Sequence, residues 1–247
     1  MTRRAVLSGG IAAGAAVAGT WFLREEKEAR AEGDREEARV DTNALAPPIM
    51  RRADWGANEA LRKPVEHYDT TVEKLVVHHT GTGNDVADWG AAVREIYEFE
   101  VANGFTDISY NFLIDPTGVV YEGRWARDYA DAAVPDGEDA KARAVRGGHA
   151  FAHNPRSIGF ALLGDYNAVE PSAAAIDALV RLLGWKCARW DLDPLGTGRY
   201  VPTSGSASDL PTIYPHTSVT ATECPGSNVV ATMDELRNRT AAFLASS

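Results

Sequence analysis

Glu73-Lys74-Leu75-Val76-Val77-His78-His79-Thr80 is the stretch that decides the fold. This short apolar run is rich in valine and ends in a polar loop with two glycines, a pattern that predicts a buried β-strand. Successive side chains of a strand point to opposite faces of its sheet. His78 and His79 therefore cannot both reach one site, and alternation alone does not say which of them does.

Strand and helix patterns alternate along the rest of the chain. We predict a helix from Asn84 or Asp85 to about Gly104, followed by a hairpin of residues 109–115 and 118–123. A polar loop over 125–148 leads to a strand over 158–163 and a helix from Ser172 to Trp190. The chain then continues with a loop or small ribbon over 191–211, a strand over 212–219 and a closing helix that contains 233–243. Strands interleaved with helices predict an α/β fold, a single domain with a central mixed β-sheet flanked by helices on both faces.

Composition limits the classes of function. The 247 residues are 45% hydrophobic and 24% charged, which suits one globular domain with appendages. The net charge is −10, so the chain lacks the basic surface that binding of nucleic acid requires. It also lacks a general attraction to anionic membranes or cell walls, so any binding must come from a shaped site.

The N-terminal residues predict export. Residues 1–23 begin with Thr2-Arg3-Arg4-Ala5-Val6-Leu7, which resembles a twin-arginine export signal, and contain a small-residue cleavage site at Ala16-Val17-Ala18. We expect an exported protein, extracellular or in the cell wall. The alternative is an uncleaved anchor, which would be the only membrane contact. Residues 24–46 predict a charged flexible linker, and residues 47–247 form the functional domain.

The two cysteines leave two alternatives. In an exported protein, Cys187 and Cys224 could form a disulfide. Cys187, however, belongs to an apolar stripe at helical spacing, where cysteine acts as a small core hydrophobe. We favour this interpretation, which leaves the Cys224 thiol free to bind a metal.

A metal site is the chemistry that the histidines and cysteine suggest. His216 and Cys224 lie eight positions apart, and one histidine of the upstream pair would complete a set of two imidazoles and one thiolate. A catalytic zinc takes three such ligands and leaves a fourth position open. Pro225 excludes a helix here, but a strand end followed by a returning loop can bring both side chains together. Taken alone the signal is weak, because a histidine in an apolar strand is usually a packed core residue.

Four further motifs follow the histidine pair. In this order the chain contains the stretches Asp107–Asp115, Gly118–Arg124, Ser157–Ala161 and Thr222–Gly226. Together they resemble the N-acetylmuramoyl-L-alanine amidase type 2 family, the T7-lysozyme-like zinc amidases that include the peptidoglycan recognition proteins. The resemblance runs from about Arg51 to the C-terminal helix.

The resemblance implies a zinc cofactor held by His78, His216 and Cys224, with His79 outside the site. It implies hydrolysis of the amide bond between N-acetylmuramic acid and L-alanine, with peptidoglycan or its muropeptide fragments as the partner. A non-catalytic peptidoglycan-binding receptor is the alternative. Cys224 favours the enzyme, because receptors of this family that lack the cysteine do not form a three-ligand zinc site.

The resemblance also assigns roles around the metal. Tyr110 and Thr222 match the two auxiliary catalytic positions of the family. Arg124, His149 and Asn154 match residues that line the substrate groove.

This chain departs from the family pattern in three places. Pro215-His216-Thr217-Ser218 stands where the family usually has Gly-His-Arg-Asp, and Phe99-Glu100 replaces a histidine that is common near the end of the first helix. The loop over 125–148 is longer and bears several acidic residues. We expect these changes to affect specificity more than metal binding.

Overall fold

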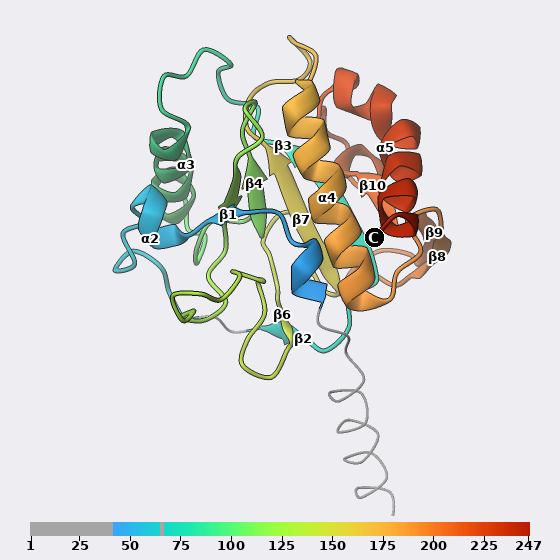
Figure 1. The fold of residues 1–247 in the computed structure, drawn as a ribbon, viewed down its shortest axis with the longest axis horizontal. Helices are drawn as coiled ribbons and strands as arrows, with labels where there is room; N and C mark the ends of the chain where they lie inside the picture. The colour runs from blue at the N-terminus through green and yellow to red at the C-terminus, as the bar shows by residue number, and fades with distance from the viewer. Residues whose placement is uncertain (1–41, 65–66) are drawn as a thin grey trace, which may run out of the picture. The chain divides into compact units, whose positions relative to one another are not determined.

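The computed structural model describes residues 42–64 and 67–247 (Figure 1). The predicted export signal and most of the predicted linker lie outside the described residues. The strands are β1 (Ile49–Met50), β2 (Tyr68–Asp69), β3 (Lys74–His79), β4 (Phe112–Ile114), β5 (Val120–Glu122), β6 (Ala144–Val145), β7 (Ser157–Leu162), β8 (Thr197–Tyr200), β9 (Ser208–Pro211) and β10 (Ile213–Pro215). The helices are α2 (Arg52–Trp55), α3 (Trp89–Ala102), α4 (Ala173–Trp190) and α5 (Ser227–Ala245), with short 3-10 turns η1 (Thr42–Leu45) and η2 (His216–Ser218).

Six strands form one mixed sheet in the order β1-β5-β4-β7-β3-β10. Strands β4, β7, β3 and β10 run parallel, whereas β5 runs antiparallel to β4. In the parallel register, Val77 of β3 lies beside Phe160 of β7 and Pro215 of β10. The predicted central mixed sheet is confirmed, with the predicted strand of residues 73–80 in its interior.

Helices cover both faces of the sheet, as predicted (Figure 1). On one face, Leu75 and Val77 of β3 are fully buried against α4 and α5. On the other face, Leu113 and Ala161 pack against α2 and α3. Burial of one leucine or valine side chain contributes about 1.5–3 kcal/mol, so both layers stabilise the sheet.

A two-stranded ribbon of β8 and β9 completes the second face. Its Tyr200 and Leu210 pack on Val76 and Tyr214 of the sheet. The ribbon confirms one of the two alternatives predicted for residues 191–211. Since Val76 and His78 are two residues apart in β3, His78 lies on the face that carries the ribbon, and not on the face covered by α4.

The start of α3 differs from the prediction. The helix begins at Trp89, and the carboxylate of Asp88 accepts a hydrogen bond from the Ala91 N–H at 3.0 Å. Asn84, predicted as a cap, instead bonds through both amide atoms to the backbone of Asp165, at 3.0 and 2.9 Å. A long-range partner therefore removes this residue from the helix start.

The strand predicted over residues 212–219 was too long. Strand β10 ends at Pro215, and His216 opens the turn η2, in which Val219 N–H donates to the His216 carbonyl at 3.1 Å. The 3-10 turn ends the ladder with β3 at Pro215, although β3 itself continues to His79. Helix α5 then begins directly after Gly226 and includes the predicted residues 233–243.

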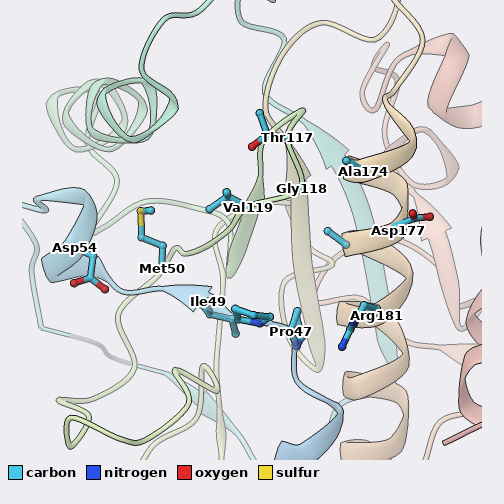
Figure 2. Close-up of a pocket in the computed structure, with 12 residues that line it drawn as sticks. Pro47, Ile49, Met50, Asp54, Thr117, Gly118, Val119, Ala174, Asp177 and Arg181 are labelled. Atoms are coloured by element: carbon cyan, nitrogen blue, oxygen red, sulfur yellow. The ribbon is translucent and has the colours of Figure 1, made fainter.

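Among the described residues, no helix has both the length and the apolar character needed to cross a membrane. A pocket of about 610 Å³ lies where β1, the turn between β4 and β5, and α4 meet (Figure 2). Apolar side chains such as Ile49, Met50 and Val119 line it beside Asp177. None of the predicted site residues lines this pocket, so it is separate from the predicted metal site.

Glu122 links α2 to the sheet and makes stability depend on pH. Its buried carboxylate accepts a hydrogen bond from the Arg52 N–H at 3.1 Å. Burial raises the pKa of Glu122 from 4.5 to about 7. The folded protein therefore binds this proton more tightly than the unfolded chain does. The stability contributed by this proton is fully present below pH 4.5 and is lost as the pH rises to about 7.

Glu122→Gln is expected to remove this dependence. Relative to the variant, the wild type should lose at most about 3 kcal/mol of unfolding free energy between pH 4.5 and pH 7.5. Urea denaturation of both proteins across this range, with a chelator present throughout, measures the difference. Parallel stability curves for the two proteins would contradict the expectation.

Candidate metal centre

Three side chains from three segments converge on one point. His78 comes from β3, His216 from the first residue of η2, and Cys224 from the loop before α5. One ligand atom from each, two imidazole nitrogens and one sulfur, lie within 4.8 Å of one another. The three predicted metal ligands are therefore brought together.

The parallel register places the two histidines. Pro215 lies beside Val77 in the ladder, so the next residues of the two strands, His216 and His78, are neighbours. Their ring centroids are 4.5 Å apart. Strands β3 and β10 therefore bring together two side chains that are far apart in the sequence.

A returning loop brings Cys224 to the histidines. The Thr217 N–H donates to the Cys224 carbonyl at 3.1 Å, which closes the loop between them. Gly226 then passes close to the segment after β7, with φ at +93°. A Cβ at Gly226 would lie 2.5 Å from the Tyr166 carbonyl carbon, so only glycine fits this approach. The loop is thus held against the body of the domain.

His79 points away from the site, as the resemblance implied. Its Nδ1 accepts a hydrogen bond from the Tyr166 N–H at 3.2 Å. Only its backbone takes part in the centre, because the His79 N–H donates to the Cys224 sulfur at 3.4 Å. Backbone donation of this kind stabilises a thiolate.

Burial keeps the three candidate ligands neutral. It raises the pKa of the Cys224 thiol to about 11 and lowers the pKa of His216. Burial also lowers the pKa of His78 well below its usual range, with smaller effects from the neighbouring histidines. Neutral imidazoles can bind a metal at neutral pH, whereas the thiol must release its proton when a metal binds.

The residues fit a zinc ion. Two imidazoles and one thiolate form a ligand set that zinc accepts, with a fourth position left for water or substrate. The Nε2 atom of His216 is buried and has no hydrogen-bond partner in the described part of the chain. A buried polar nitrogen without a protein partner calls for a bound water or ion.

Tyr110 lies next to the metal ligands. Its ring centroid is 5.4 Å from that of His78. Burial raises the pKa of Tyr110 far above its usual value, and the nearby Glu100 and Cys224 add to this effect. The phenol therefore stays protonated and can donate a hydrogen bond.

Glu100 supports the segment that carries Tyr110. Its carboxylate accepts hydrogen bonds from both the backbone N–H, at 2.7 Å, and the hydroxyl of Ser109. The replacement of the family's histidine by Phe99-Glu100 thus places a half-buried carboxylate on Ser109, the residue before the tyrosine. The substitution is visible in the sequence, but the contact of Glu100 with Ser109 is not.

Thr222 is bound to the cysteine loop. Its Oγ1 accepts a hydrogen bond from the Cys224 N–H at 3.2 Å. A threonine hydroxyl accepts and donates at once, so its proton can still be donated to another group. This arrangement is compatible with the predicted auxiliary role.

The three predicted groove residues have different surroundings. Arg124 donates to the Thr106 hydroxyl at 2.6 Å, and its buried Nε has no partner among the described residues. The side-chain oxygen of Asn154 accepts from the Ala150 N–H at 2.7 Å and so closes a surface turn. His149 is only 7% exposed, and its ring lies behind His78 rather than on an open surface.

Both cysteines are free, which confirms the favoured interpretation. Cys187 is fully buried in α4 among the residues that face the sheet. Burial raises the pKa of its thiol to about 12, so it stays a neutral core side chain.

Comparison with known proteins supports the sequence resemblance. Residues 68–227 match the protein family described as N-acetylmuramoyl-L-alanine amidase. Peptidoglycan-recognition protein SC2 of Drosophila melanogaster is 31% identical over 191 residues, which cover 75% of this chain and 84% of that protein. Peptidoglycan-recognition protein LB of the same species is 25% identical over 200 residues, 79% of this chain and 72% of that protein.

Solved structures share the fold. Wild-type Drosophila PGRP-LB aligns with a TM-score of 0.56 at 25% identity, over 76% of this chain and 92% of that chain. The N-acetylmuramoyl-L-alanine amidase LysC of Clostridium intestinale aligns with a TM-score of 0.55 at 21% identity, over 78% of this chain and 97% of that chain. A Drosophila PGRP-LB mutant was solved in complex with tracheal cytotoxin. It aligns with a TM-score of 0.56 at 25% identity, over 77% of this chain and 95% of that chain.

Proposed function

Because this chain belongs to the N-acetylmuramoyl-L-alanine amidase family, we propose that it is a zinc-dependent hydrolase. Its reaction is cleavage of the amide bond between N-acetylmuramic acid and L-alanine in peptidoglycan or its muropeptide fragments. The observation that carries the proposal is the convergence of His78, His216 and Cys224, with ligand atoms within 4.8 Å of one another. A receptor needs no such set of metal ligands.

The residues around the centre have separable roles. His78, His216 and Cys224 would hold the zinc. When bound, zinc lowers the pKa of water and polarises a carbonyl group. Tyr110 stays protonated and donates a hydrogen bond to the oxygen that gains negative charge, and the Thr222 hydroxyl supplies a second donor.

Other observations support the substrate and the location. The names of the relatives, peptidoglycan-recognition proteins, support peptidoglycan as the partner. The net charge of −10 argues against nucleic acid. Arg3-Arg4 and the uncharged stretch after it support export to the wall by the twin-arginine route, and a membrane contact only if that segment stays uncleaved.

Digestion of purified peptidoglycan tests the function. The expected result is release of stem peptides that begin with L-alanine, together with free carboxyl groups on muramic acid. A chelator should abolish the release, and added zinc should restore it. Binding to the wall without release would favour the receptor, and release that survives chelation would remove zinc from the mechanism.

A further inference from the structure

We infer that His149 is a positioning residue of the metal centre. It accepts a hydrogen bond from the Nε2–H of His78 and so fixes the tautomer in which Nδ1 of His78 is free to bind the metal. This inference rests on the proposed zinc site, and it gives His149 a different role from the groove contact that the resemblance implied.

The His78 ring has two different sides. Its Nδ1 lies 3.5 Å from the sulfur of Cys224, on the side of the proposed metal. Its Nε2 lies 3.0 Å from Nδ1 of His149, on the opposite side. A metal-bound histidine uses one nitrogen, and the hydrogen bond made by the other nitrogen decides which tautomer is present.

Ser157 sets the direction of the hydrogen bonds. Its hydroxyl proton is shared between the backbone carbonyls of His153, at 2.6 Å, and of Asn154, at 3.0 Å. A hydroxyl has one proton, so its oxygen is left to accept from Nε2–H of His149, which lies 3.4 Å away. His149 then carries its proton on Nε2 and presents an unprotonated Nδ1 to His78.

The resulting chain of hydrogen bonds has one polarity. His78 donates to His149, His149 donates to Ser157, and Ser157 donates to the backbone. Each donor is satisfied, and the unprotonated nitrogen of His78 is Nδ1, which faces the Cys224 sulfur. Backbone carbonyls of the turn before β7 therefore determine which nitrogen of a metal ligand is available.

Two glycines hold the His149 ring in this position. A Cβ at Gly159 would lie 2.4 Å from Cγ of His149, and a Cβ at Gly147 would lie 2.6 Å from its Cδ2. The ring occupies the space that side chains at both positions would need. It also meets the His78 ring edge-on, with centroids 4.9 Å apart.

Two substitutions of His149 separate hydrogen bonding from space filling. His149→Asn keeps an oxygen acceptor near the place of Nδ1, whereas His149→Leu has similar bulk and no acceptor. Zinc dissociation constants are measured by competition with a chromophoric chelator, with circular dichroism as the check of folding. Loss of a partner that orients a metal ligand typically weakens binding about 10–100-fold, which is the result expected for the leucine variant. The asparagine variant should stay close to the wild type, and equal affinity of both variants for zinc would overturn the inference.

Nuclear magnetic resonance of the zinc-loaded wild type tests the same point without any substitution. The ¹⁵N shifts of the rings should show His149 protonated on Nε2, and His78 protonated on Nε2 with its Nδ1 bound to metal. A proton on Nδ1 of His149 would overturn the inference even if both variants failed to fold. If the wild type binds zinc and digests peptidoglycan but this tautomer is absent, only the inference fails. If the wild type binds no zinc, the proposed function fails with it.

Discussion

Cys224→Ser is expected to abolish both zinc retention and amide hydrolysis. The substitution replaces the one ligand that bears a negative charge when deprotonated with a hydroxyl that remains neutral. Loss of an outer partner alone weakens metal binding about 10–100-fold, so loss of a direct ligand should weaken it by more than about 100-fold. Metal analysis after gel filtration and assay of stem-peptide release measure the two effects.

Cys187→Ala is the matched control for this experiment. This cysteine is fully buried in α4, in a core cluster that contains none of the three proposed ligands. The control should bind one zinc and retain activity, even if removal of the sulfur lowers its melting temperature. A serine variant at Cys224 that retained one zinc per chain through gel filtration would refute the proposed ligand set.

Tyr110→Phe is expected to reduce kcat about 10²–10³-fold, the usual effect of removing one hydrogen-bond donor from a developing oxyanion. Zinc content should not change, because the tyrosine packs against the ring of His78 and is not one of the three proposed ligands. KM should also change little, because the donor acts on charge that appears in the transition state. Initial rates on a soluble muropeptide, together with zinc analysis, separate these quantities.

Tyr121→Phe provides the comparison for Tyr110. Its hydroxyl donates to Asp115 at 2.8 Å, in the hairpin and away from the metal ligands. This variant should be less stable and yet hydrolyse the substrate normally once it is folded. If Tyr110→Phe kept full activity, or lost zinc, the role of donor to the substrate would be wrong.

Local patterns predicted much of the fold. The helix α4 begins where the sequence places Ser172, whose hydroxyl accepts from the Ala175 N–H at 3.0 Å, because a cap of this kind involves only neighbouring residues. The turn from Asp115 to Gly118 is likewise local, and its Gly118 N–H donates to the Asp115 carbonyl at 3.0 Å. Both features depend on residues within four positions of each other.

Features that depend on distant partners were not predictable in this way. Asn84 looked like a helix cap, but its partner is Asp165, on a loop that only the folded sheet brings near. Strand alternation alone could not decide whether His78 or His79 reaches the metal site, because that depends on which face of β3 is covered by α4. The hydrogen bond from His78 to His149 joins residues 71 positions apart, and no pattern in the sequence marks it.

The ladder between β3 and β10 has a consequence for variation among related chains. His78 and His216 directly follow the paired residues Val77 and Pro215 of adjacent strands. Their separation is therefore independent of how many residues connect the two strands. The tip of the ribbon, residues 201–207, lies outside this ladder. Insertions or deletions there leave the spacing of the two imidazoles unaltered, so the ribbon tip can diversify while the geometry of the centre is inherited unchanged.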